Sequence, residues 1–445
     1  MHPSYFEHLQ QVQQQSAAAL EACGFDGLLI GSGHLHPRFL DDNYYPFRAN
    51  PHFLRWLPFL SEHPHCWLLW RPGRTPVLYY HAPDDFWHLT PSVPDDWWTT
   101  AFEIRPYSAP AELHRALQPQ AGLAVISEQP PAVNGVDWPH NPQALLNRLH
   151  FQRAVKTDWE LHCLRQANVT AVKGHTAAEQ LFHEGASEYR IHQGYLQAIE
   201  HNERDMPYDN IVALNEHAAV LHYQFQQRQA PQQSRTLLLD AGAVHLGYAA
   251  DITRTFTAGG TPFAELVAAL DRAQRQLLGE VKAGACFIEL HRRMHHLLAG
   301  ILQEHGLVNA SAESIVERGI SRTFFPHGLG HLLGLQVHDV GGWQQDGEGA
   351  LGEPPAEHPF LRLTRELQPG FVITIEPGLY FIPSLLKKLR DSEAGADVNW
   401  QAIGQLQPWG GIRIEDNVAV TDDGCENFTR DAFAAQQAAD QARAL

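Results

Sequence analysis

The sequence predicts a mixed α/β (α+β) protein of two domains, and three observations support this. The 445 residues are 44% apolar and 18% charged, which suits a large buried core and excludes a disordered tail or a coiled coil. Short apolar runs alternate with helical patterns up to about residue 150. The pattern then changes to long helices and later strands. We therefore expect domains at 1–155 and 156–445.

The first domain is predicted to be a small α/β domain. Residues 4–22 are helix formers in an amphipathic order, and the turn at Gly24 ends them. Further helical patterns cover 110–117 and 142–150. Apolar runs typical of strands cover 27–30, 66–70, 76–80 and 123–127.

The second domain is predicted to begin with a helix at a capping box. Thr157 can act as the N-cap, and Glu160 follows three residues later. Helical patterns then cover 158–184, 187–201, 262–282 and 287–304. Strand patterns cover 211–214, 236–240 and 247–256. The last third is rich in Gly, Pro and short β-branched runs.

Charge and cysteine usage narrow the class of protein. Fifty acidic residues against 32 basic ones give a net charge of −18, which disfavours nucleic acid and anionic membranes as partners. The five cysteines are scattered and form no Cys-x-x-Cys, which favours a reducing compartment. No leader-like start and no apolar run of about 20 residues is found. We expect a cytoplasmic protein.

Two aspartates flank a predicted turn. Asp240 ends an apolar run, and Asp251 lies on the strand that follows. If the hairpin is centred near residues 245–246, the two lie directly opposite, with Cβ atoms about 4.5–5.5 Å apart. Like charges opposed in a half-buried sheet require a cation or a proton between them. Alternatively, one aspartate caps a turn and faces water.

Histidines and two glutamates stand in later motifs. Three histidines within 12 residues are separated by glycines: His327, His331 and His338. Such glycines let the backbone approach a ligand, although a single histidine there could be structural. Glu376 ends a β-branched strand before Pro-Gly, where a buried carboxylate needs a partner. Period-two alternation places Arg413 and Glu415 on one strand face, which a surface salt bridge would also explain.

These segments together supply four carboxylates and at least one imidazole. Such oxygen-rich ligation suits a pair of ions such as Mn²⁺ or Co²⁺, with zinc as an alternative. Two metals about 3.5–4 Å apart are a common hydrolytic device, because they acidify a bridging water and polarise a carbonyl. The chain contains no His-Glu-x-x-His, no P-loop and no Gly-x-Ser-x-Gly.

The ordered set of ligand-type residues resembles the metal signature of the creatinase/methionine-aminopeptidase ("pita-bread") family. The set is Asp240, Asp251, His331, Glu376 and Glu415. The prolidase-like branch, with the similar organophosphorus acid anhydrolases, is matched over 40–47, 208–216, 221–223, 326–331, 335–339, 374–378 and 411–416. The resemblance implies a creatinase-like N-terminal domain, a pita-bread domain with a curved antiparallel sheet, and a homodimer. All five positions are filled, unlike in the metal-free creatinase branch.

The resemblance also implies an activity, the hydrolysis of Xaa-Pro dipeptides by two divalent ions per subunit. Mn²⁺ is the expected metal, with Co²⁺ or Zn²⁺ as alternatives. Asp240 and Asp251 would hold one ion, with Asp251 bridging. His331 and Glu376 would hold the other, and Glu415 would bridge both. Glu376 would also accept the proton of the attacking water.

Substrate-handling residues are implied in the same way. The substrate-side histidines, which would stabilise the oxyanion, are His222, His327 and His338. Arg413 would orient the bridging carboxylate, and Arg362 would face the substrate carboxylate. The implied pocket-wall residues are Tyr208, Leu361, Phe287 and Trp87. Phe287 stands where Tyr is usual, which makes the wall more apolar. Trp87 would come from the partner subunit.

Three alternatives remain open at this point. An aminopeptidase P-like enzyme would accept longer Xaa-Pro peptides. A catalytically weak peptide-binding relative would be expected to lack a ligand, and none is missing. Organophosphate triesters are a side substrate to consider, because their phosphorus centre resembles the tetrahedral intermediate of peptide hydrolysis.

Overall fold

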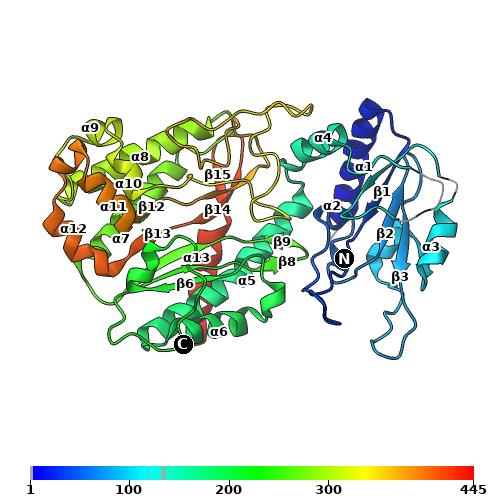
Figure 1. Ribbon diagram of the computed structural model, residues 1–445, viewed down its shortest axis with the longest axis horizontal. Helices are drawn as coiled ribbons and strands as arrows, with labels where there is room; N and C mark the ends of the chain where they lie inside the picture. Colours follow the sequence, from blue (N-terminus) through cyan, green and yellow to red (C-terminus); the bar gives the residue numbers. More distant parts are fainter. Residues whose placement is uncertain (1–3, 119, 132, 134–136, 445) are drawn as a thin grey trace. The chain divides into compact units, whose positions relative to one another are not determined.

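The computed structural model describes residues 4–118, 120–131, 133 and 137–444. Its elements divide into two units (Figure 1). Unit 1 contains residues 1–153, 157–160 and 346–350, and unit 2 contains 154–156, 161–345 and 351–445. Each unit combines helices with a sheet, so the predicted mixed α/β fold class is confirmed.

Unit 1 is built on one sheet with the strand order β4-β3-β2-β1-β5. Its strands are β1 (Gly27–Gly31), β2 (Trp67–Trp70), β3 (Val77–His81), β4 (Glu103–Tyr107) and β5 (Leu123–Ile126). Its helices are α1 (Ser4–Cys23), the short α2 (Pro51–Leu54), α3 (Pro110–Leu117) and α4 (Gln143–Arg153). The four predicted strands are present. The edge strand β4 is missed, because Pro106 within it is unfavourable in a strand interior.

Unit 2 is rich in helices, and α5 begins at the predicted capping box. Glu160 N donates to Thr157 Oγ1 at 3.3 Å, and Thr157 N donates to Glu160 Oε2 at 3.0 Å. The helices are α5 (Asp158–His183), α6 (Glu188–Ile199), α7 (Pro262–Leu278), α8 (Phe287–Glu304), α9 (Ala312–Glu317), α10 (Ile320–Phe324), α11 (Pro383–Arg390), α12 (Trp400–Leu406) and α13 (Phe428–Ala444). They surround the strands, with α6 packed on β6, α7 on β10 and α13 on β14 (Figure 1).

The strands of unit 2 form two three-stranded sheets and two ribbons. Their bounds are β6 (Ile211–Leu214), β7 (Thr236–Asp240), β8 (Val244–His245), β9 (Tyr248–Ala249), β10 (Thr253–Thr257), β11 (Val372–Ile375), β12 (Gly378–Tyr380), β13 (Gly411–Arg413), β14 (Asp416–Val420) and β15 (Cys425–Asn427). The sheet orders are β10-β7-β6 and β11-β14-β15, and the ribbons are β8-β9 and β12-β13. All of these pairs are antiparallel. A bridge between Thr253 and Glu415 connects the first sheet to the strand end before β14.

The predicted register of the aspartate hairpin is wrong by two residues. Asp240 pairs with Thr253, and the separate ribbon β8-β9 keeps the same register. Leu246 and Gly247 form the two-residue turn, and both have positive φ, as a type I′ hairpin requires. The turn is therefore centred one residue later than expected. Asp240 and Asp251 become diagonal neighbours instead of direct partners.

No helix in the described ranges is long and apolar enough to cross a membrane.

The largest apolar cluster of unit 2 joins α7, α8 and the strands β11 and β14. A second cluster joins α5 and α6 to β6 and β7. The polar residues between the two sheets are thus held on rigid, buried elements.

Candidate metal centre

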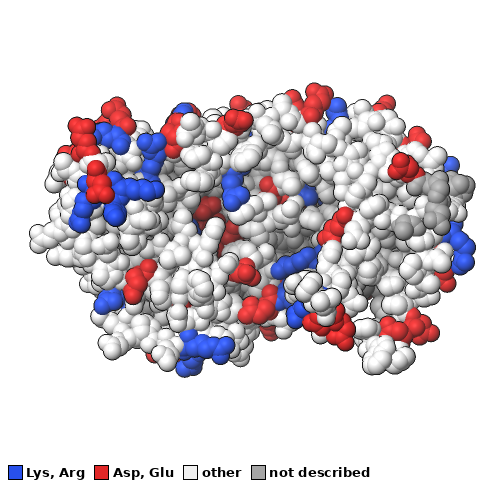
Figure 2. All heavy atoms as spheres, in the orientation of Figure 1, with Lys and Arg blue, Asp and Glu red and all other residues white. Residues whose placement is uncertain are grey.

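An open cavity of about 630 Å³ in unit 2 brings most of the predicted site residues together. The predicted residues that line it are His222, Asp240, Asp251, His327, His331, His338, Arg362, Glu376, Arg413 and Glu415. Acidic side chains are visible in a hollow over β13 and β14 (Figure 2). Apolar residues that the sequence analysis did not identify complete the wall: Val220, Leu221, Phe360, Ile382 and Leu385.

The five ligand-type residues converge from separate strand ends and turns. One ligand atom each from Asp251, His331 and Glu415 lies within 4.8 Å of the others. His331 Nε2 is 3.4 Å from Asp251 Oδ2 and 3.6 Å from Glu376 Oε1. Its Nδ1 contacts the Leu332 carbonyl at 3.0 Å, which leaves Nε2 as the ligand nitrogen.

The electrostatics of this cluster favour a bound cation. Burial raises the pKa of Glu376 to about 7, although His331 opposes the shift. Burial and the neighbouring carboxylates also raise the pKa of Glu415. Burial raises the pKa of Asp240 as well, and Asp251 adds to this shift although Arg413 opposes it. Asp240 Oδ1 is buried and accepts no hydrogen bond within the described part of the chain. The residues therefore fit divalent ions, which would neutralise the carboxylates and ligate that oxygen.

Arg413 connects several side chains of the centre. It donates from Nη2 to Asp240 Oδ2 at 2.7 Å and from Nη1 to the Tyr380 hydroxyl at 2.8 Å. Its Nε donates to Thr253 Oγ1 at 3.2 Å, and Thr253 donates to Glu415 Oε2 at 2.7 Å. We expected Arg413 to orient Glu415 directly. The contact is indirect because β13 ends at Arg413, and Glu415 pairs instead with Thr253.

His327 is held by the same network. Because Arg413 can only donate, the Tyr380 hydroxyl is free to donate its proton to His327 Nε2, 2.9 Å away. His327 Nδ1 then donates to the Gly328 carbonyl at 2.8 Å. Burial and Arg413 lower the pKa of His327 to about 3, so the ring is neutral. In this arrangement His327 offers no free N–H, unlike the expected oxyanion donor.

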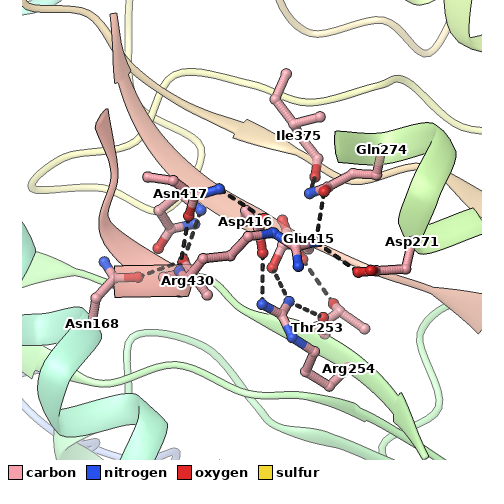
Figure 3. Close-up of polar contacts among 12 residues, drawn as sticks. Asn168, Thr253, Arg254, Asp271, Gln274, Ile375, Glu415, Asp416, Asn417 and Arg430 are labelled. Carbon is pink, nitrogen blue, oxygen red and sulfur yellow. Dashed lines mark hydrogen bonds and ion pairs between the residues drawn. The ribbon is translucent and has the colours of Figure 1, made fainter. Parts of the chain in front are cut away.

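Behind the ligands lies a buried ion network that the sequence analysis did not identify (Figure 3). Asp416 accepts from Arg254 at 2.7 Å and from Arg430 at 2.5 Å. Burial by itself would raise the pKa of Asp416, but these two arginines lower it to about 2. Arg254 also donates to the Glu415 carbonyl at 2.8 Å, and Asn417 Oδ1 accepts from Asp251 N at 3.0 Å. The network thus fixes the backbone at two of the predicted metal-ligand positions, Asp251 and Glu415.

We expect Asp416→Asn to lower the free energy of unfolding by about 1.5–3 kcal/mol, because it leaves the partly buried Arg254 without its counter-charge and Arg430 with Asp271 alone. Urea unfolding measures the change. Asp422→Asn, at an exposed turn, is the matched control and is expected to change stability by less than about 0.5 kcal/mol. Equal stabilities of the two variants would contradict the structural role of Asp416.

Four predicted substrate residues do not line the cavity. Tyr208 lies beside the aspartates. Burial by itself would raise the pKa of Asp251, but His331 and, to a smaller extent, the Tyr208 hydroxyl lower it. Leu361 is buried next to Gly328. Phe287 is the first residue of α8 and is fully buried in the large apolar cluster, so the expected pocket-wall position is wrong for this cavity. Trp87 lies in unit 1 and is 78% exposed, and its role toward a partner stays a prediction.

A cavity with buried carboxylates and an imidazole at its base defines a metallohydrolase-type centre. The family model described as "Metallopeptidase family M24" matches residues 162–422, and that described as "Xaa-Pro dipeptidase, N-terminal domain" matches residues 3–151. The chain belongs to metallopeptidase family M24.

Individual proteins resemble the chain over nearly its whole length. The Xaa-Pro dipeptidase of Stenotrophomonas maltophilia (strain K279a) is 45% identical over 97% of each chain. That of Xanthomonas euvesicatoria pv. vesicatoria (strain 85-10) is 45% identical over 97% of this chain and 98% of its own. The structure of E. coli aminopeptidase P with the inhibitor Pro-Leu has a TM-score of 0.71 at 25% identity, covering 97% of this chain and 99% of that one. Proline aminopeptidase P II from Yersinia pestis has the same TM-score and identity, covering 95% and 96%.

Proposed function

We propose that this protein is a metal-dependent Xaa-Pro dipeptidase. The observation that carries the proposal is a single cavity, which holds the ligand-type side chains together with Arg362 and the histidines of the substrate side. The 45% identity to proteins named Xaa-Pro dipeptidase supports the substrate class.

Two divalent ions are assigned to the centre, with Mn²⁺ preferred and Co²⁺ or Zn²⁺ as alternatives. Asp240 and Asp251 would hold one ion, His331 and Glu376 the other, and Glu415 both. When bound, the ions would polarise the scissile carbonyl and acidify the attacking water. The raised pKa values of the clustered carboxylates support this assignment.

Glu376 is the proposed proton carrier. Burial raises its pKa to about 7 in the metal-free chain, and bound ions would lower that pKa, so the carboxylate would be ionised and able to accept a proton at neutral pH. It would take a proton from the attacking water and deliver it to the prolyl nitrogen as the C–N bond breaks. His327 Nδ1 is 3.7 Å from Glu376 Oε2, so the neutral ring would pack beside the carboxylate without a hydrogen bond to it, because its N–H donates to the Gly328 carbonyl.

Substrate recognition would rely on the prolyl half of the dipeptide and on the scissile carbonyl. The peptide bond before proline has no N–H to read, so recognition depends on the carboxylate, the carbonyl and the apolar ring. Arg362 would pair with the free carboxylate, and His222 and His338 would donate toward the carbonyl oxygen. Ile382 and Leu385 provide apolar wall for the ring.

The chain length of the substrate tests this proposal. With Mn²⁺ loaded, kcat/KM for Leu-Pro is expected to exceed that for a Leu-Pro-Yaa tripeptide at least about 10-fold, because a charged hydrogen bond is worth about 1.5–3 kcal/mol. Arg362→Gln should raise KM for Leu-Pro by a similar factor, whereas Arg390→Gln on an exposed position of α11 should not. Faster cleavage of the tripeptide would favour an aminopeptidase P-like activity.

Arg413→Lys is expected to lower kcat/KM at least about 10-fold and to reduce bound metal. Lysine cannot reproduce the planar fork that bonds Asp240, Tyr380 and Thr253. The control is Arg293→Lys, because Arg293 makes a half-exposed pair with Glu280 worth about 0–1 kcal/mol. Unchanged turnover and metal content in Arg413→Lys would contradict its role.

A homodimer and a cytoplasmic location are also proposed. Exposed Trp87 would contact the partner subunit, and the oligomeric state is measurable by light scattering. All five cysteines are free thiols, which suits a reducing compartment. Hydrolysis of organophosphate triesters stays a prediction for the same centre.

A further inference from the structure

A second cluster of potential ligands lies in unit 2, built from residues outside the carboxylate centre. His291 and His295 stand four residues apart on α8 and are each 1% exposed. His358, from the segment 355–362, completes the cluster. The three ring centroids are 4.3–4.7 Å apart, and one nitrogen from each ring lies within 4.8 Å of the others.

Two buried nitrogens of this cluster have no hydrogen-bond partner among the described residues, His291 Nδ1 and His295 Nε2. The other nitrogen of His295 contacts Ser321 Oγ at 3.0 Å. This is the arrangement of a ligating histidine, in which one nitrogen bonds an oxygen and the other keeps its lone pair. Leaving such nitrogens unbonded in the interior lowers stability.

We propose that His291, His295 and His358 form a separate metal site for a borderline divalent ion, with Zn²⁺ as the fitting probe. Three imidazoles without a carboxylate favour zinc and its neighbours over Mn²⁺ or Mg²⁺. Nitrogens bound at 2.0–2.1 Å lie at most about 4.2 Å apart, so binding draws the rings slightly together. His358 is half-buried on a loop and can make this adjustment.

The charges around the cluster are compatible with a cation. Arg292 and Arg322 flank the rings. Arg292 is paired with Glu289 at 2.7 Å and with Glu357 at 2.9 Å, so two carboxylates balance the two guanidinium groups. Burial and the neighbouring rings lower the pKa of His291 to about 2. The lone pairs are therefore available at neutral pH without loss of a proton.

The site would fix part of the catalytic cavity. His358 precedes Phe360 and Arg362, which both line that cavity. Its carbonyl accepts from Leu361 N at 3.2 Å. An ion bound to His358 would therefore tie the segment that carries Arg362 to helix α8.

The test is a zinc titration of the full-length, metal-stripped protein, followed by metal analysis after gel filtration. Wild type is expected to retain one more equivalent of zinc per chain than His358→Ala. The matched control is His296→Ala, because His296 is exposed on the same helix next to His295, and it should bind as wild type does. His358→Cys, which keeps a zinc ligand, should restore the lost equivalent.

Thermal unfolding gives a second readout on the same proteins. The extra equivalent of zinc should raise the melting temperature by a few degrees in wild type, His296→Ala and His358→Cys, but not in His358→Ala. If His358→Ala fails to fold, His358→Gln replaces it. Equal zinc content and equal thermal shifts in wild type and the non-ligating variant would overturn the proposal.

Discussion

At least about 100-fold slower hydrolysis is expected for Glu376→Gln, with the fold and at least one metal ion retained. The amide oxygen of Gln can still ligate a metal, but the amide cannot accept a proton. Glu376 follows β11, and its carboxylate lies within 3.6 Å of His331 and 3.7 Å of His327. A side chain of the same size should keep this packing.

The measurements for Glu376→Gln are kcat on Leu-Pro, metal content and dipeptide binding by calorimetry. The control is Glu366→Gln, which removes the same charge at an exposed position and should keep wild-type turnover. If excess Mn²⁺ returned the Glu376→Gln rate to near wild type, the side chain would be a ligand without a role in proton transfer.

Much of the fold and the centre is readable from the sequence because the signals are local. Residues 211–214 and 236–240 are apolar runs with clear ends, and both strands have the predicted bounds. Ligand-type residues at strand ends are likewise visible as single carboxylates in apolar or Gly-rich surroundings. Helix α13 is missed because the last third was interpreted by its overall content of Gly, Pro and β-branched residues, and the alanine-rich run at 428–444 was not considered separately.

The contacts that hold the centre depend on tertiary structure and have no local signal. Tyr380 and His327 are 53 residues apart in sequence but are bonded through their side chains. Arg254 reaches Asp416 across 162 residues. The register of the β8-β9 hairpin depends on which two residues form its turn. Leu246 takes the first turn position with a positive φ, and leucine is not a residue that sequence rules favour at such a position. Phe287 shows the converse, since a resemblance assigned it a pocket role while the structure buries it.

Complete loss of hydrolysis is expected when divalent ions are removed by chelation, together with a lower melting temperature. Ligands that bind only the folded state stabilise it by mass action, about 4 kcal/mol at 1,000 times Kd. Without ions, Asp240, Asp251, Glu376 and Glu415 face one another in a buried cluster, where Arg413 and His331 are the main cations that oppose their repulsion. Addition of Mn²⁺ should restore both activity and melting temperature.

The stability that the protein loses on chelation should also depend on pH, and the pKa of Glu376 gives the direction of this dependence. In the metal-free chain the pKa of Glu376 is raised from an ordinary 4.5 to about 7. A raised carboxyl pKa contributes stability that is fully present below pH 4.5 and is lost as the pH rises through about 7. The melting temperature of the chelated protein should therefore fall between about pH 4.5 and 7 and level off above that, whereas that of the loaded protein should change less. In Glu376→Gln this part of the pH dependence should be absent.

Full activity in a sample shown to be metal-free, or a chelated protein as stable as the loaded one at pH 8, would exclude the two-ion centre, because four buried carboxylates cannot all stay ionised without a compensating charge.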